Sequence, residues 1–217
     1  MTVSVLLDND VLIKLARMDA YLDALSSMEL TPRQVGSLKP MLRHVGLYDN
    51  SRLVRFTDNA AEAARLLAAL KTVVVMEMTP PEAALATKVA KLVLSVGLDF
   101  NEGELMMCVV AVSRGNLDFC TADKRALNSL PGVEACWADV GNMRGRCICF
   151  EQVFYALCRK FGLARVTRAV QTCPTTEKSM TRLHAVSVAR GEEHFLRALE
   201  RYVEDRISRP ARGWLKP

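Results

Sequence analysis

Three acidic residues far apart in the chain adjoin short apolar segments in a way that could build one site. Asp8 follows the apolar run at residues 3–7, and Asp123 follows the run at residues 117–121. Glu104 falls in the first turn of an expected helix that precedes the second run. Carboxylates with few histidines or thiolates nearby are typical ligands of Mg²⁺ or Mn²⁺. We therefore predict that Asp8, Glu104 and Asp123 form a metal site and act as its catalytic residues.

A divalent cation held in this way can activate water for in-line attack on a phosphodiester, so no covalent nucleophile is needed. Each acid also has a simpler explanation. Asp8 and Asp123 could each cap a helix, and the helix dipole favours an acid such as Glu104 in a first turn. Their joint placement is what favours the metal site.

The segments that must position these acids alternate between strand and helix. Residues 3–7, 117–121 and 133–137 predict strands, and residues 71–78 predict a strand or a helix end. Helices are expected from residue 11, from the Thr-Pro pair at 31–32, over 59–70, over 80–96, from 104 and over 124–130, with a turn at the Pro-Gly pair 131–132. Buried strands that alternate with helices indicate an α/β fold with a parallel sheet flanked by helices.

Three segments of the chain resemble PIN-domain nucleases. Residues 3–15 (VSVLLDNDVLIKL) resemble the opening of these domains. The segment NEGEL at 101–105, with the following Ala111, resembles their "gly-glu-ala" helix start. Residues 118–127 (DFCTADKRAL) resemble their strand that ends in Thr-x-Asp-Lys. The order and separation of these motifs carry the resemblance, which covers residues 3–140.

The resemblance implies a three-layer α/β/α domain with a central, mostly parallel sheet at residues 1–140. It implies a metal-dependent endoribonuclease that uses Mg²⁺ or Mn²⁺ and has Asp8, Glu104 and Asp123 as metal ligands. Thr121 would be a polar group near the metal. Asp10 would contact the residues that bind the metal without binding the metal itself. The family commonly has a fourth acid, for which Asp139 is the first candidate, ahead of Glu77 and Glu102.

Many small stand-alone proteins of this kind are toxins of toxin–antitoxin pairs. The resemblance therefore implies RNA as substrate and an antitoxin or another inhibitor protein as partner, and it leaves a homodimer open. A PIN-like domain that is catalytically weak and binds a protein partner is the alternative without catalysis.

A second enzyme class fits the first acidic motif. Residues 6–11 (LLDNDV) also resemble the strand and Asp-x-Asp signature of haloacid-dehalogenase-like phosphohydrolases, in which Asp8 would be the nucleophile and Asp10 the acid and base. That family has threonine or serine where this chain has Leu12, and a paired Asp-Asp late in the chain that is absent here. The nuclease interpretation is therefore favoured.

The positive charge is concentrated in the last third of the chain. Residues 1–149 have 16 Lys and Arg against 17 Asp and Glu, whereas residues 150–217 have 13 against 7, a net charge of +6. This distribution excludes a uniformly basic protein. We expect a helical, basic C-terminal extension at residues 141–217, with two or more helices over 150–207 and a frayed tail at 209–213.

The extension suggests a nucleic-acid-binding surface that guides RNA towards the acids, with contacts from Arg201, Arg206, Arg209 and Arg212. A solvated helix face and a protein-binding helical element, for an inhibitor or a second subunit, are the alternatives.

Composition and targeting signals point to a cytoplasmic protein. The N-terminus has no basic region before its apolar residues, so it does not predict a signal peptide. No run of 18 apolar residues occurs, so no membrane span and no membrane partner are expected. The seven cysteines are an odd number among mostly apolar neighbours, which predicts reduced, packed thiols rather than disulfides or a metal site.

Overall fold

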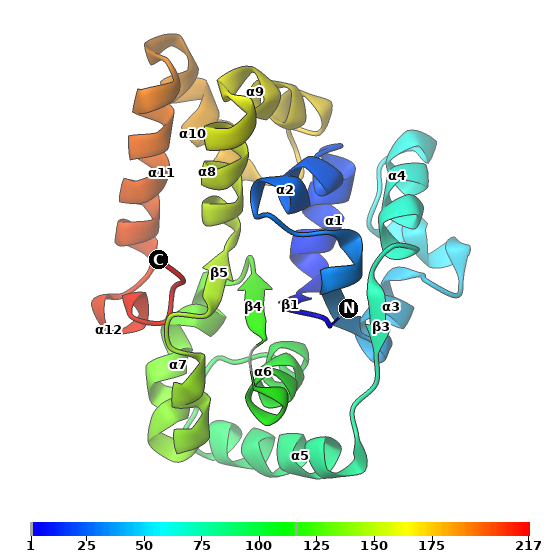
Figure 1. Ribbon diagram of the computed structural model, residues 1–217, viewed down its shortest axis with the longest axis vertical. Helices are drawn as coiled ribbons and strands as arrows, with labels where there is room; N and C mark the ends of the chain where they lie inside the picture. Colours follow the sequence, from blue (N-terminus) through cyan, green and yellow to red (C-terminus); the bar gives the residue numbers. More distant parts are fainter. Residues whose placement is uncertain (1, 116) are drawn as a thin grey trace.

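A computed structural model describes residues 2–115 and 117–217 and contains a single five-stranded sheet in that part of the chain (Figure 1). All neighbouring strands are parallel, in the order β3-β2-β1-β4-β5. The strands are β1 (Val5–Leu7), β2 (Val35–Leu38), β3 (Val74–Met76), β4 (Asp118–Thr121) and β5 (Cys147–Cys149). The predicted α/β class and parallel sheet are confirmed.

Helices cover both faces of the sheet, which gives three layers. Successive residues of β1 separate the layers, because Val5 and Leu7 belong to one buried cluster and Leu6 to the other. The Leu7 face is covered by α1 (Asn9–Arg17), α2 (Tyr21–Ser27), α4 (Ala60–Leu70), α8 (Phe150–Phe161), α9 (Leu163–Thr172), α10 (Lys178–Ser187) and α11 (Glu192–Arg206). The Leu6 face is covered by α5 (Pro80–Ser95), α6 (Glu102–Arg114), α7 (Lys124–Cys136) and α12 (Arg209–Arg212). The three-layer α/β/α architecture is therefore confirmed.

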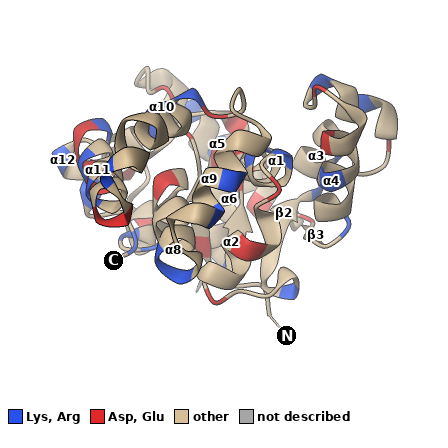
Figure 2. Cartoon of the chain, turned by 90° about the horizontal axis from the view of Figure 1, so that it is seen from above, with Lys and Arg blue, Asp and Glu red and all other residues tan. Residues whose placement is uncertain are grey.

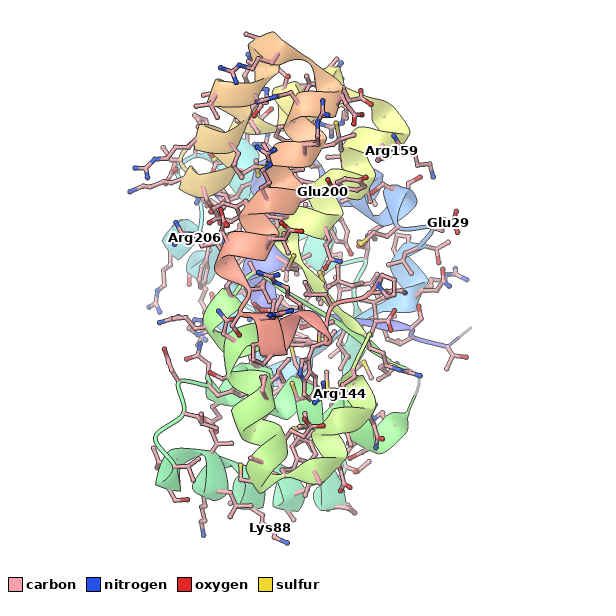
Figure 3. All side chains as sticks on the ribbon, turned by 90° about the vertical axis from the view of Figure 1, so that its left-hand side faces the viewer. Glu29, Lys88, Arg144, Arg159, Glu200 and Arg206 are labelled. Carbon is pink, nitrogen blue, oxygen red and sulfur yellow. The ribbon has the colours of Figure 1, made fainter. Side chains whose placement is uncertain are left out.

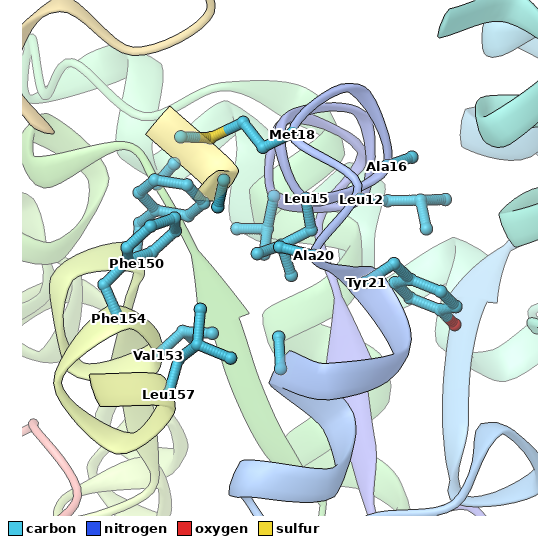
Figure 4. Close-up of a cluster of buried hydrophobic side chains, with 14 of the residues drawn as sticks. Leu12, Leu15, Ala16, Met18, Ala20, Tyr21, Phe150, Val153, Phe154 and Leu157 are labelled. Atoms are coloured by element: carbon cyan, nitrogen blue, oxygen red, sulfur yellow. The ribbon is translucent and has the colours of Figure 1, made fainter. Parts of the chain in front are cut away.

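The first cluster ties the N-terminal half of the chain to the C-terminal helices. Leu12 and Leu15 of α1 lie at helical spacing and are fully buried. They face the same cluster as Phe150 and Phe154 of α8, whose rings are tilted against each other with centroids 5.0 Å apart (Figure 4). Burial of such side chains is worth about 2 kcal/mol each. This packing holds α1, and with it the end of β1, against the C-terminal part.

Residues 133–137, which we predicted to be a strand, form the end of α7 instead. The buried residues of α7 are Ala126, Leu127, Leu130 and Val133. This spacing is helical, and the helix continues through Pro131 and the following glycine. The predicted turn at 131–132 is therefore also wrong. The burial of one helix face outweighs the hydrogen bond that Pro131 cannot donate.

The helix predicted to begin at the Thr-Pro pair is a single 3₁₀ turn, η1 (Pro32–Gln34), and β2 follows it directly. The sequence of β2 contains a glycine and a serine, so it lacks a strong strand signal. The glycine is required by close packing, because a Cβ at Gly36 would lie 2.4 Å from the Met76 sulfur. A further short helix, α3 (Lys39–Val45), and a 3₁₀ segment, η2 (Asn50–Arg55), complete the path to α4.

The sheet extends past the boundary expected at residue 140. After the 3₁₀ segment η3 (Ala138–Met143), β5 pairs in parallel with β4. The tail expected to fray is ordered by the same strand, because Cys147 donates its backbone N–H to the Trp214 carbonyl at 2.8 Å. Trp214 is fully buried. The expectation of a frayed tail is therefore wrong, and the chain end covers an edge that would otherwise be open.

The predicted helices at 59–70 and 80–96 are confirmed as α4 and α5. Thr79 caps α5 and Glu82 closes the capping box, as the Thr-Pro-Pro-Glu sequence indicates. All seven cysteines are free thiols, and six of them are buried. Within the described residues, the structure has no helix with the length and apolar character needed to cross a bilayer.

Candidate active site

The candidate site lies at the point in the sheet where the strand order reverses, between β1 and β4. The chain builds β2 and β3 on one side of β1, and then β4 and β5 on the other. Functional groups in open parallel sheets gather at the carboxyl ends of the strands next to such a switch point, here between β1 and β4. Leu7 pairs with Cys120 in these strands, and the Asp8 backbone N–H donates to the Cys120 carbonyl at 2.9 Å. Asp8 and Thr121 are therefore neighbours at this edge.

The hydroxyl group of Thr121 lies among all three predicted acids. Its Oγ1 atom is 3.4 Å from Asp8 Oδ2 and 3.3 Å from Glu104 Oε1. The backbone N–H of Asp123 donates to the same Oγ1 at 3.0 Å. Glu104 reaches this point from the first turn of α6, as the sequence predicts. The structure therefore brings the Asp8 and Glu104 carboxyl groups together at Thr121, whereas Asp123 meets Thr121 through its backbone N–H.

Burial makes two of these carboxyl groups hard to ionise. Glu104 is 4% exposed, and burial together with the charges of Asp123 and Asp8 raises its pKa to about 8. Asp8 is 7% exposed, and burial together with the charge of Asp10 raises its pKa to about 6. Glu104 Oε2 is buried without a hydrogen-bond partner among the described residues. Among the described residues, Asp8 and Glu104 therefore form no ion pair, and their few hydrogen bonds do not offset their burial.

Asp123 differs from the other two acids because it has partners of its own. Its Oδ1 accepts from the Arg125 backbone N–H at 2.8 Å and caps α7, and its Oδ2 lies 2.9 Å from Arg125 Nη2. Burial raises the pKa of Asp123, but these Arg125 contacts outweigh burial and the net pKa is lowered. The side chain of Asn101 also donates to Asp123 Oδ2, at 3.4 Å. Asp123 therefore combines the capping role with a place in the site, whereas Asp8 makes no capping hydrogen bond.

The three acids line a cavity of about 510 Å³. This volume lies in the range of roughly 300–1,000 Å³ that is usual for ligand pockets. Asp10 also lines the cavity, but its carboxylate is 2.7 Å from Lys14 Nζ and it is more than half exposed. Part of the cavity wall is formed by α3 and by the end of η2. The cavity therefore combines the three acids with a wall of different chemistry.

The proposed fourth acid is not brought to the cavity. Asp139 is exposed on η3 and does not line the cavity. Glu77 follows β3 and is bonded to Lys39 instead, and Glu102 is exposed on the first turn of α6. None of these three carboxylates joins Asp8, Glu104 and Asp123 around Thr121.

Sequence reasoning missed a buried acid at the end of β5. Glu151 is 1% exposed in the first turn of α8, and its Oε1 lies 2.7 Å from Lys124 Nζ. Burial lowers the pKa of Lys124, but the charge of Glu151 more than offsets it, so the net pKa is raised. Because Lys124 follows Asp123 directly, this ion pair anchors the turn that carries Asp123. The sequence signal for it is the short apolar run at 147–149, which forms β5 directly before α8.

A second acidic group, Asp58, Glu62 and Cys173, brings its ligand atoms within 4.8 Å of one another. Arg17 already occupies it, with Nε 2.6 Å from Glu62 Oε2 and a further contact to Asp58. The guanidinium supplies the positive charge that these carboxylates need, so the group is explained as an ion-pair network.

The four C-terminal arginines lie away from the cavity. Arg201 and Arg206 are on α11, and Arg209 and Arg212 are on α12. None of them lines the cavity, and α11 and α12 lie at the opposite side of the molecule from α3 and α4 (Figures 1 and 2). Arg206 packs over the Tyr202 ring, 5.4 Å from its centroid, and lies on another side of α11 than Glu200 (Figure 3).

Comparisons of the chain with protein-family models, with curated proteins and with solved structures gave no match.

Proposed function

We propose that this cavity is the active site of a metal-dependent endoribonuclease, which hydrolyses phosphodiester bonds with Mg²⁺ or Mn²⁺. The observation that carries the proposal is that the Asp8 and Glu104 carboxyl groups meet at Thr121 in a cavity that Asp123 also lines, with Glu104 Oε2 buried and without a partner among the described residues. The resemblance of the sequence motifs to PIN-domain nucleases supports the same reaction and RNA as substrate.

The donor set fits a hard divalent cation. The three candidate ligands are carboxylates, and among the described residues that line the cavity His44 is the one histidine and there is no cysteine. Raised pKa values at Glu104 and Asp8 show that the pair lacks a counter-charge, which a divalent cation would supply. A bound ion of this kind would supply Lewis-acid activation of water for attack at phosphorus.

The residues around the acids would hold them in place for this chemistry. The Thr121 hydroxyl lies between Asp8 and Glu104 and fixes the distance between them. Asn101 orients Asp123, and the buried Lys124–Glu151 pair secures the turn behind it. Rigid support of this kind keeps ligands in position without reorganisation during the reaction.

The context of the activity follows from the resemblance and is part of the proposal. We propose a cytoplasmic protein whose activity is restrained by an antitoxin or another inhibitor protein.

Cleavage of RNA in the presence of Mn²⁺ tests the proposal. Asp8→Asn removes one carboxylate charge at nearly constant shape, and we expect the rate to fall about 100-fold or more. Asp205→Asn makes the same chemical change at an exposed position on α11 and should leave the rate unchanged.

Three outcomes would overturn the proposal. Full activity of folded Asp8→Asn protein in chelated buffer would exclude the carboxylate site. Absence of cleavage by the unmodified protein would leave a binding module. Burst hydrolysis of a phosphomonoester with a trapped aspartyl phosphate on Asp8 would identify a phosphohydrolase instead.

A further inference from the structure

The wall of the cavity that α3 and the end of η2 form carries an aromatic pair. His44 of α3 is exposed, and its ring meets the Phe56 ring edge to face, with centroids 5.5 Å apart and planes at 69°. Phe56 is half-buried and packs against the hydrophobic core. The core therefore holds Phe56, and Phe56 holds an exposed imidazole ring at the cavity wall.

The same wall carries a cation with no ion-pair partner. Three Lys or Arg side chains line the cavity, at positions 14, 17 and 55. Lys14 is paired with Asp10 and Glu177, and Arg17 is paired with Asp58 and Glu62. Arg55, at the end of η2, is exposed and forms no ion pair within residues 2–115 and 117–217. Of the three Lys and Arg side chains among the described lining residues, Arg55 is therefore the one that remains available to an anionic ligand.

The segment around this wall is basic as a whole. Residues 39–56 contain four Lys and Arg against one Asp. Arg43 lies over the ring of Tyr48, which is 61% exposed, at 5.8 Å from its centroid. Positive charge interleaved with exposed rings is the composition of single-stranded nucleic-acid sites, where bases stack on side chains and cations contact phosphates. An apolar protein partner would not select for this surplus of positive charge.

We propose that this wall, formed by His44, Arg55 and Phe56, holds single-stranded RNA as it leaves the carboxylate end of the cavity. Arg55 binds a backbone phosphate, and an unpaired base stacks on the His44 ring that Phe56 orients. The inference rests on the proposed function in one respect, since it places the scissile phosphodiester at Asp8 and Glu104. Stacking on a side chain requires an unpaired base, so the wall selects single strands over duplex.

This inference assigns the RNA contact nearest the acids to the N-terminal half of the chain. The C-terminal arginines, at positions 201, 206, 209 and 212, lie on α11 and α12 across the molecule (Figure 1). A strand that enters the cavity meets the α3–η2 wall within the same cavity, whereas it must leave the cavity to reach α11.

Binding of a labelled ten-nucleotide oligouridylate tests the inference apart from cleavage. The titrations use the Asp8→Asn protein in chelated buffer, so no cleavage is required. Arg55→Ala should weaken binding about tenfold and reduce the slope of log affinity against log salt by about 0.7. His44→Ala should weaken binding of oligouridylate about tenfold, yet leave binding of an oligomer of the same length without bases unchanged. Both side chains are exposed, so both variants should fold, as circular dichroism and the melting temperature will check.

Two further variants serve as comparisons. Arg33→Ala makes the same charge change at an exposed position outside the cavity and should bind like the parent protein. Arg201→Ala probes α11, and a loss there with none at Arg55→Ala would place the RNA on the C-terminal helices and overturn the inference. Equal affinity for duplex RNA, or no binding of oligouridylate by the parent protein, would also overturn it.

The outcomes separate the two proposals. If Arg55→Ala and His44→Ala weaken binding but the unmodified protein cleaves no RNA with Mn²⁺, the wall is an RNA site and the nuclease proposal fails. If the unmodified protein cleaves RNA and both variants bind oligouridylate normally, the nuclease proposal stands and the inference about the wall fails.

Discussion

Replacement of Glu104 by glutamine should stabilise the protein in the absence of metal while it impairs metal binding. Burial beside Asp123 and Asp8 raises the pKa of Glu104 to about 8, from an ordinary value of 4.5. The folded protein therefore keeps a proton on Glu104 between these pH values, whereas the unfolded chain releases it. Because the folded state binds more protons, stability must fall as pH rises through this range.

The size of the effect follows from the two pKa values. Each pH unit well inside the interval costs about 1.4 kcal/mol, so the loss between pH 5 and pH 8 is about 3.5 kcal/mol as an upper limit. Glutamine has nearly the same shape and does not titrate, so Glu104→Gln should lack this loss. The pKa of Asp8 is also raised, to about 6, so its titration contributes to both curves.

Urea unfolding of both proteins from pH 5 to pH 9 in chelated buffer measures this difference. Glu102→Gln makes the same change at an exposed position of the same helix turn and should follow the unmodified protein. Added Mn²⁺ should narrow the difference, since metal at 100 times its dissociation constant adds about 2.7 kcal/mol to a protein that binds it, against a loss of up to about 3.5 kcal/mol. Parallel curves for the unmodified protein and Glu104→Gln between pH 5 and pH 8 would refute the buried, charge-poor cluster.

Two further changes test the elements that support the site. Glu151→Gln leaves the half-buried Lys124 without its counter-charge and should cost about 3 kcal/mol of unfolding free energy in urea. Glu134→Gln, in an exposed pair with Arg144, should cost less than about 1 kcal/mol. Equal losses would contradict the role of the buried pair. Trp214→Ala empties a fully buried site beside Cys147 and should lower the free energy of unfolding by about 3–5 kcal/mol in the same assay. A loss below about 1 kcal/mol would show that the chain end does not pack on β5.

The acids around Thr121 could be predicted from the sequence because local signals mark each of them. Asp8 and Asp123 follow apolar runs that are too short for helices and are buried as β1 and β4. In a parallel sheet such runs end at one edge, so the acids that follow them must lie near each other. The position of Glu104 could be predicted because the Asn-Glu-Gly-Glu segment indicates that a helix begins there, before β4.

The features missed in the sequence depend on contacts between distant residues. Residues 133–137 contain an apolar run that suits a strand, and only the packing of α7 on the sheet selects the helix. The strand at 147–149 is short and is completed by pairing with β4 and by the chain end near Trp214. Glu151 became visible only when that strand was placed, since its burial and its pairing with Lys124 are tertiary.

The arrangement of charge inside the cavity bears on function more directly than the charge of either half of the chain. Lys14 and Arg17 line the cavity, yet each is neutralised by acids that lie outside the cluster on Thr121. Within the described part of the chain no ion pair includes Glu104 or Asp8, whose raised pKa values reduce the stability of the folded state near neutral pH. Buried acids that cost stability are characteristic of functional sites, because the strain is relieved when the ligand binds. In the proposed function a divalent cation would relieve it, and the phosphate backbone of RNA would follow that cation into a cavity whose acids alone would repel it.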